Sequence, residues 1–141
     1  MIIMSVDLGK ARTGIAKCDK SEMIASPVTV ISEHNREKLA DEISKLALEI
    51  KPELIVVGLP KNMDGSMGES AQNALSFAEL LKEKTGVPTE MQDERGTTVT
   101  AHNYLNVTNT RGKKRKAVVD AVAAVIILED YLRKRKNKLN G

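Results

Sequence analysis

The sequence contains little cysteine and few aromatic residues. Its 141 residues include one cysteine, Cys18, two tyrosines, one phenylalanine and no tryptophan. A single cysteine excludes an internal disulfide framework and favours a reducing compartment. The scarcity of aromatic rings argues against a surface on which the bases of single-stranded nucleic acid stack.

Long hydrophobic runs are also missing from the sequence. No apolar run approaches the roughly 20 residues that a membrane-spanning helix requires, and the N-terminus lacks the charged start, apolar stretch and cleavage site of a signal peptide. We therefore expect a cytoplasmic protein with no membrane partner. Because a chain of this length can bury a core without disulfides or a structural metal, we expect residues 1–141 to form a single domain.

Charge is unevenly distributed along the chain. Residues 1–110 contain 12 Lys and Arg against 16 Asp and Glu, a net charge of −4, whereas residues 111–141 contain 10 against 3, a net charge of +7. This asymmetry favours a polyanionic partner over a small neutral ligand. A basic helix that is simply solvated is the alternative explanation.

Three short apolar segments near the N-terminus predict the first strands of a sheet. They cover residues 2–4, 14–18 and 24–30. The short loops between them are typical of an antiparallel meander. Apolar residues at helical spacing then predict a helix from about residue 35 to residue 50, which Lys51 and Pro52 end.

The middle of the chain alternates strands and helices. Residues 54–58 form a continuous apolar run, which is typical of a buried parallel strand. A second amphipathic helix has its apolar face within residues 71–81, and residues 89–93 form a short strand. This order predicts an α/β fold with a mixed five-stranded sheet. Its first three strands are antiparallel, the last two are added in parallel to the first, and helices cover both faces.

The C-terminal part of the chain is more polar. Thr97 or Thr98 could cap a short helix that continues to about Leu105. We expect the polar and then cationic residues 106–116 to be mobile, and a final helix to run from about residue 117 to residue 136.

Residues 7–14 have the features of a ligand-binding turn. Asp7 ends a strand that is predicted to be buried, where a carboxylate is unusual, and Gly9 and Gly14 allow the main chain to approach a ligand closely. Arg12 lies inside this turn. Its guanidinium group could contact a phosphate or pair with an acid of the fold, and the sequence leaves both roles open.

Two further carboxylates are expected near Asp7. Ligands collect at the carboxyl ends of parallel strands, where the fifth strand presents Asp93 and Glu94, and strand alternation allows only one of these two to face the site. Helical spacing puts Asp120 on the buried side of the last helix, in line with Ala124. Three such carboxylates repel one another unless a hard cation such as Mg²⁺ or Mn²⁺ binds them.

Four segments of the sequence carry a family resemblance. They are DLGKARTGIA at residues 7–16, VGLPKNMDGS at 57–66, DERGTT at 93–98 and KAVVDAVAA at 116–124, in this order over nearly the whole chain. Together they resemble the YqgF/RuvX family of the ribonuclease H-like superfamily. That family is described as pre-16S rRNA nucleases and formerly as Holliday junction resolvases.

The resemblance implies a ribonuclease H-like fold and a nuclease that uses a divalent metal, Mg²⁺ or Mn²⁺. It also implies that Asp7, Glu94 and Asp120 are both the catalytic acids and the metal ligands. The resemblance therefore favours Glu94 over Asp93 as the second acid.

Substrate binding is expected from the turn after the first strand, the loop 58–66, the segment after Glu94 and the basic segment 111–116. The basic segment would hold the nucleic-acid backbone, unless it is only a solvated run. The loop is rich in ordinary turn formers, so its substrate role depends on the resemblance. The candidate substrate-binding residues are Arg12, Asn62, Arg95, Lys113 and Lys116.

We therefore expect a nuclease that acts on structured RNA, with 5′-end processing of pre-16S rRNA as the implied role. A Holliday junction resolvase acting on branched DNA would use the same acids but needs two symmetric cuts and hence a two-fold dimer. The sequence is compatible with a monomer or a homodimer. A non-catalytic RNA-binding protein is a further alternative, whereas an actin-like ATPase is disfavoured because the chain is too short for a two-domain cleft.

Overall fold

The computed structural model describes residues 1–61, 64, 66–93 and 112–140, with the backbone alone for 112–121, 139 and 140. Its strands form a single five-stranded sheet in the order β3-β2-β1-β4-β5. The strands are β1 (Ile3–Asp7), β2 (Arg12–Cys18), β3 (Ala25–Ser32), β4 (Leu54–Leu59) and β5 (Thr89–Asp93). The pairs β1–β2 and β2–β3 are antiparallel, whereas β4 and β5 run parallel to β1. The predicted mixed sheet is therefore confirmed.

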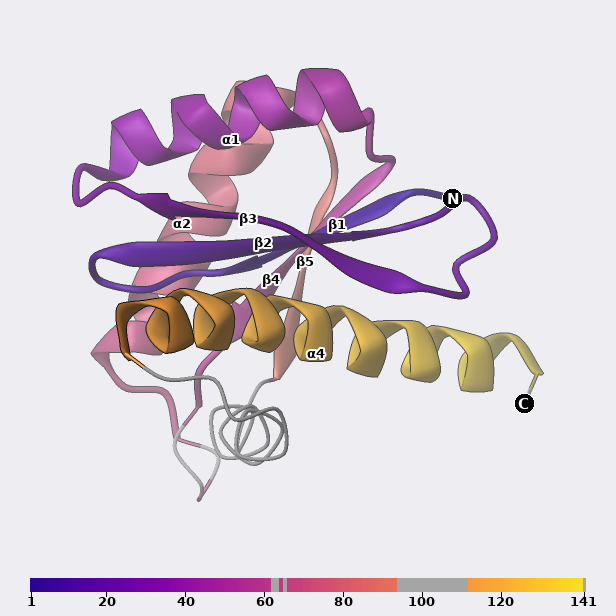
Figure 1. Cartoon of the computed structure of the whole chain (residues 1–141). Helices are drawn as coiled ribbons and strands as arrows, with labels where there is room; N and C mark the ends of the chain where they lie inside the picture. The colour runs from indigo at the N-terminus through magenta and orange to yellow at the C-terminus, as the bar shows by residue number, and fades with distance from the viewer. Residues whose placement is uncertain (62–63, 65, 94–111, 141) are drawn as a thin grey trace.

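Helices cover both faces of the sheet, as predicted (Figure 1). Helices α1 (Arg36–Ile50) and α2 (Glu69–Thr85) lie on one face, and α4 (Gly112–Asn140) lies on the other. The side chain of Asn35 caps α1 by accepting a hydrogen bond from the main-chain N–H of Lys38 at 3.0 Å. Helix α2 ends at Gly86, whose φ of 72° is favourable for glycine.

Alternation along the strands divides the apolar core into two layers. Met4 and Val6 of β1 pack with the buried faces of α1 and α2. Ile3 of the same strand packs against α4, together with Ile127 and Leu128. Each layer is formed by one face of the same central strands, so the position of α4 is tied to β1.

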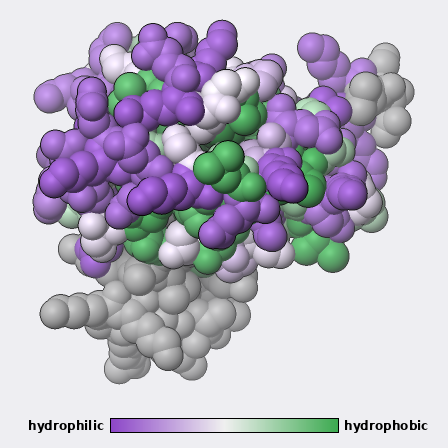
Figure 2. All heavy atoms as spheres, turned by 90° about the horizontal axis from the view of Figure 1, so that it is seen from above, coloured by the Kyte–Doolittle hydropathy of each residue, from purple (hydrophilic) through white to green (hydrophobic). Residues whose placement is uncertain are grey.

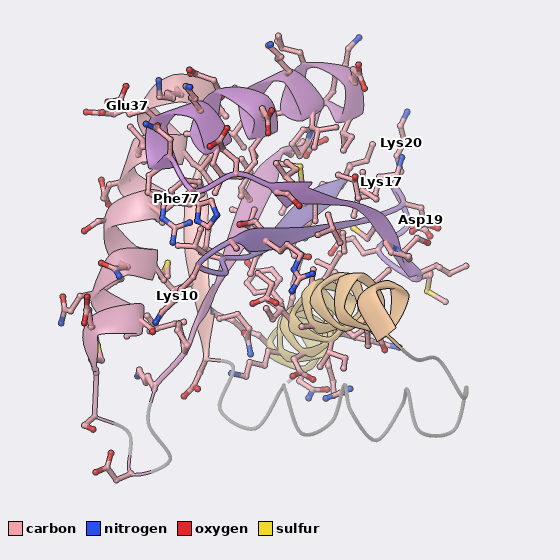
Figure 3. The ribbon with its side chains drawn as sticks, turned by 60° about the vertical axis from the view of Figure 1, so that its left-hand side comes forward. Lys10, Lys17, Asp19, Lys20, Glu37 and Phe77 are labelled. Carbon is pink, nitrogen blue, oxygen red and sulfur yellow. The ribbon has the colours of Figure 1, made fainter. Side chains whose placement is uncertain are left out.

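The outer face of the α1 and α2 layer is mostly hydrophilic, with separate apolar groups between the polar ones (Figure 2). Leu48 of α1 is one of the exposed apolar side chains, with 77% of its surface accessible. In contrast, Phe77 of α2 points inward between its helix and the sheet (Figure 3) and is buried. Both helices are therefore amphipathic covers of the sheet. Among the described residues, no helix combines the length and the apolar character needed to cross a membrane.

The last helix begins earlier than the sequence predicted. It starts at Gly112 and ends at Asn140, whereas we expected residues 117–136, and residues 112–116, expected to be mobile, are helical. Lysine and arginine have high intrinsic helix propensity, and no proline interrupts this run. The cationic stretch has no apolar periodicity, which is the signal on which the prediction relied. The helix predicted to end near Leu105 lies outside the described residues, and the single domain over residues 1–141 stays a prediction.

Glu22 joins the start of β1 to the far end of α4. Its carboxylate accepts hydrogen bonds from the amino group of Met1 at 2.9 Å and from Nε of Arg135 at 2.6 Å. Partial burial alone would raise the pKa of Glu22, but the hydrogen bonds from the amino group and Arg135 outweigh it and lower the pKa below its ordinary value. The charged form of Glu22 is therefore the form that stabilises the fold.

We expect Ile127→Ala to lower the free energy of unfolding by about 2–5 kcal/mol, because the side chain is fully buried under the sheet and its removal leaves a cavity. Urea unfolding followed by circular dichroism measures this change. Leu48→Ala, on the exposed side of α1, is the control and should change stability by less than about 0.5 kcal/mol. A similar small effect for both variants would contradict the described packing of α4.

Glu22→Gln should destabilise the protein by about 1 kcal/mol at neutral pH, since it removes two partly exposed charge pairs. A carboxyl group whose pKa is lowered by folding stabilises above its unfolded pKa, and this contribution is lost as the pH falls through the folded pKa. The difference between the two proteins should therefore shrink from about pH 5 downward. Glu49→Gln, at an exposed position of α1, is the control. If the difference in unfolding free energy between the parent protein and Glu22→Gln did not change with pH, the lowered pKa of Glu22 would be contradicted.

Candidate active site at the carboxyl edge of the sheet

Asp7 is the last residue of β1, at the edge where the parallel strands β1, β4 and β5 all end. It pairs with Gly14 of β2 on one side. The register of β1 with β4 brings Gly58 to its other side, and Gln92 of β5 lies beyond Gly58. A partly buried carboxylate at a sheet edge thus lies between two residues that have no side chain.

The side chain of Asp7 lies on the face of the sheet that α4 covers. The hydroxyl of Ser5 donates a hydrogen bond of 2.7 Å to the main-chain oxygen of Ala124 in α4. Val6 belongs to the layer of α1 and α2. Because successive side chains of a strand point to opposite faces, Asp7 faces α4 as Ser5 does. Because glycine has no side chain, neither of the two glycines that flank Asp7 places a Cβ atom beside its carboxylate.

Helix α4 runs antiparallel to β1 (Figure 1). Ser5 is bonded to Ala124, and farther back along β1 the amino group of Met1 shares Glu22 with the more distal Arg135. Asp120 precedes Ala124 by one helical turn, about 6 Å of axis. Asp7 follows Ser5 by about 7 Å in the same direction. The backbone of Asp120 therefore lies toward the same end of the sheet as Asp7, while its side chain is outside the described part.

The end of β5 bears on the choice between Asp93 and Glu94. Met91 packs with the layer of α1 and α2, and the carboxylate of Glu90 accepts a hydrogen bond from the hydroxyl of Tyr131 in α4. Alternation would assign Asp93 to the face of Met91, but Asp93, the last residue of this edge strand, also lines a hollow together with residues of α4. The structure therefore does not decide between Asp93 and Glu94. Glu94 lies outside the described residues, so its role stays a prediction.

The turn after Asp7 is held by close main-chain contacts. A Cβ atom on Gly9 would lie 2.0 Å from the main-chain oxygen of Arg12, so only glycine fits without a shift of the turn. Nη1 of Arg36 donates a hydrogen bond of 3.0 Å to the oxygen of Gly9, and the N–H of Glu33 donates one of 3.2 Å to the oxygen of Ala11. The start of α1 thus fixes the turn that follows the candidate catalytic acid.

Positive charge is present at this edge. Lys10 is exposed in the turn, at the opposite end of β2 from Lys17 and Lys20 (Figure 3). Arg12 begins β2, and alternation from Ala16, which packs under α4, assigns Arg12 to the face of Asp7. This position suits either role predicted for Arg12, a phosphate contact or a pair with an acid.

Several predicted site residues cannot be compared with the structure. Glu94, Asn62 and Arg95 lie outside the described residues. Lys113 and Lys116 lie in α4, where the structure describes their backbone but not their side chains. Within the side chains that are described, no three His, Cys, Asp or Glu lie close enough together to hold a metal ion. Of the three predicted ligands, Asp7 alone has a described side chain.

Two residues of this region were not found from the sequence. Ser5 anchors α4 to β1, and the sequence signal was a hydroxyl within an otherwise apolar strand. Arg36 holds the turn through Gly9, which is 27 residues away, and no local pattern indicates such a contact.

Solved structures of low sequence identity share this fold. The chain aligns with RuvC of T. thermophilus in complex with a Holliday junction substrate, at a TM-score of 0.61 and 14% identity over 95% of this chain and 96% of that chain. It aligns with the Holliday junction resolvase of fowlpox virus at a TM-score of 0.55 and 12% identity, over 95% and 99% of the two chains. These likenesses confirm the predicted ribonuclease H-like fold.

Closer sequence relatives cover the whole molecule. A protein of Clostridium botulinum (strain Eklund 17B) named as a pre-16S rRNA nuclease is 41% identical over 94% of this chain and 96% of its own length. A protein of Natranaerobius thermophilus with the same name is 39% identical over the full length of both chains. The sequence model of the RuvX family, described as Holliday junction resolvase, matches residues 1–134. The chain therefore belongs to the RuvX family.

Proposed function

We propose that this protein is a divalent-metal-dependent nuclease that hydrolyses phosphodiester bonds in 5′-end processing of pre-16S rRNA. The observation that carries the proposal is Asp7, a partly buried carboxylate between Gly14 and Gly58 that faces the helix containing Asp120. Relatives named as pre-16S rRNA nucleases, aligned over nearly the whole chain, support the choice of substrate. A cytoplasmic location, expected from the sequence, fits this role and stays a prediction.

The residues available at this edge suit a hard cation. Asp7, Glu94 and Asp120 would supply carboxylate oxygens, the ligands that Mg²⁺ and Mn²⁺ prefer. Gly14 and Gly58, which flank Asp7, have no side chains that would compete with an ion or a phosphate oxygen for the carboxylate. When bound, such an ion supplies an activated water and offsets the charge that develops on the phosphate.

The protein's own residues would orient these groups. Asp7 is held by a strand that is hydrogen-bonded on both sides, which keeps its carboxylate in one position. Ser5 holds α4, and with it Asp120, against that strand. Arg12, on the face of Asp7, would bind a phosphate oxygen of the substrate. Asn62, Arg95, Lys113 and Lys116 would bind the adjoining nucleotides.

A second candidate function is resolution of Holliday junctions. The description of the matching family model favours it, because that description is Holliday junction resolvase. The same acids would cut branched DNA, but resolution requires two symmetric cuts and therefore two copies related by a two-fold axis. The oligomeric state, monomer or homodimer, separates the two functions.

We expect Asp7→Asn to reduce Mg²⁺- or Mn²⁺-dependent cleavage by at least about 100-fold, because an amide is neutral and a poorer metal ligand. The assay compares a structured RNA that carries the 5′ precursor of 16S rRNA with a four-way DNA junction. Asp41→Asn is the matched control, since Asp41 lies on α1 over the other face and its side chain is 59% exposed. The control should retain activity within about twofold.

The outcomes of this assay distinguish the proposals. Equal cleavage by the parent protein and Asp7→Asn would overturn the assigned chemistry. Paired nicks in the junction by a dimer, with intact RNA, would favour the resolvase. RNA binding without cleavage, and without affinity for Mn²⁺ in calorimetry, would favour a non-catalytic RNA-binding protein.

Gly9→Ala should lower nuclease activity by at least about tenfold, because the new Cβ atom forces the turn after Asp7 to move. Gly86→Ala is the control. It also introduces a side chain at a strained position, with a φ of 72°, but it lies at the end of α2 with open space around it. Unfolding experiments should show a loss of about 1 kcal/mol for the control without loss of activity. An active Gly9→Ala protein would show that catalysis does not depend on the turn.

A further inference from the structure

The distal half of α4 carries more positive charge than its packing uses. Residues 131–141 contain five Lys and Arg and no Asp or Glu. Two of these cations have partners, since Arg133 pairs with Asp130 at 3.0 Å and Arg135 pairs with Glu22 at 2.6 Å. Lys134 and Lys138 are exposed, and neither forms an ion pair with any residue that the structure describes.

These two lysines lie on one side of α4, next to the edge strand β5. They are four residues apart and therefore about one helical turn from each other. Two adjoining hollows separate this side of the helix from β5, and both are lined by Gln92 and Lys134. Lys134 lines both hollows and Lys138 lines one of them. We refer to these two adjoining hollows together as the groove between β5 and α4.

The groove leads to the candidate active edge. One of its hollows reaches Asp93, the last residue of β5 and the neighbour of the predicted catalytic Glu94. The other continues past Tyr131 to Lys138. A chain lying in the groove would therefore connect the carboxyl edge of the sheet with the basic end of α4.

The polar groups of the groove suit a phosphate backbone. Burial and the nearby Glu90 raise the pKa of Tyr131 to about 12, so its hydroxyl stays neutral and holds the carboxylate of Glu90 through a hydrogen bond. Asn137 adds a neutral amide.

Two acids, Asp93 and Asp130, also line the groove; Asp130 pairs with Arg133, and Asp93 has a polar contact of its own. Lys134 and Lys138 are therefore the exposed cations that can attract an anion, and lysine contacts to phosphates are independent of base sequence.

We propose that Lys134 and Lys138 bind phosphates of the nucleic-acid strand that flanks the scissile bond, and that the groove between β5 and α4 guides this strand to the active edge. The inference rests on the proposed nuclease function. It adds a substrate surface on the distal half of α4, apart from the basic residues at the beginning of this helix.

The test measures binding of RNA to the Asp7→Asn protein in EDTA at several salt concentrations. The probes are a hairpin with single-stranded extensions and the same hairpin with a blunt end. Adding Lys134→Ala and Lys138→Ala should weaken binding of the extended hairpin by about tenfold at roughly 0.1 M salt. It should also reduce the slope of log K against log salt by about 1.4, the value for two contacts to a single strand. Binding of the blunt hairpin should change little.

The matched control combines Lys38→Ala and Lys45→Ala on the exposed side of α1, which removes the same charge from the opposite face of the molecule. It should leave both the affinity and the slope nearly unchanged. An equal loss in the control, or an equal loss for both hairpins, would overturn the groove as the site of the flanking strand. Unchanged binding after the α4 substitutions would overturn this inference alone. No binding of either RNA by the Asp7→Asn protein would instead overturn the proposed function.

Discussion

Every second residue of β1 faces α4, and this alternation is the constraint on which the arrangement of the site depends. On that face, Ile3 makes an apolar contact with the helix, and Ser5 donates a buried hydrogen bond to Ala124. Asp7 adds a carboxylate to the same face. The three positions differ in chemistry but share one geometry. A shift of β1 by one residue would turn Asp7 toward α1 and α2 and separate the helix from its hydrogen bond. Packing and candidate chemistry are therefore fixed by the same register.

The two faces of the sheet contribute differently to the molecule. Among the described side chains, the layer under α1 and α2 contains the larger apolar cluster. At the start of α1, Arg36 holds the turn after Asp7 through its contact with Gly9. The layer under α4 ends, at the carboxyl edge, in a row made of Gly14, Asp7 and Gly58. Glycine on both sides of an acid adds no side-chain packing to the core. Glycine within a strand is typical of a place where a ligand or another backbone approaches closely.

Much of the fold follows from local patterns, and the unpredicted features are contacts between distant residues. The apolar run at 54–58, the short strand expected at 89–93 and the helical spacing between them predicted the two parallel strands. Asp7 was expected at a strand end. The contact between Ser5 and Ala124 joins residues that are 119 positions apart, so no local pattern could indicate it. The early start of α4 at Gly112 was missed because its cationic first turns lack apolar periodicity. Glu94 and the side chain of Asp120 lie outside the described residues, so their joint role with Asp7 stays a prediction.

The charge on the distal half of α4 has no sufficient structural explanation. Lys138 lies in the last turn of α4, where the helix dipole favours a cation. Like charges four residues apart, however, destabilise a helix by about 0.2–0.5 kcal/mol, and Lys134 and Lys138 have this spacing. Ion pairs at a surface contribute little to stability. The ion pairs described in this region are made by Arg133 and Arg135, not by the two lysines. A run of exposed cations, more numerous than the acids around it, is expected where a helix meets a polyanion. The groove beside β5 connects that surface with Asp93, so the charge lies where a strand entering the candidate site would pass.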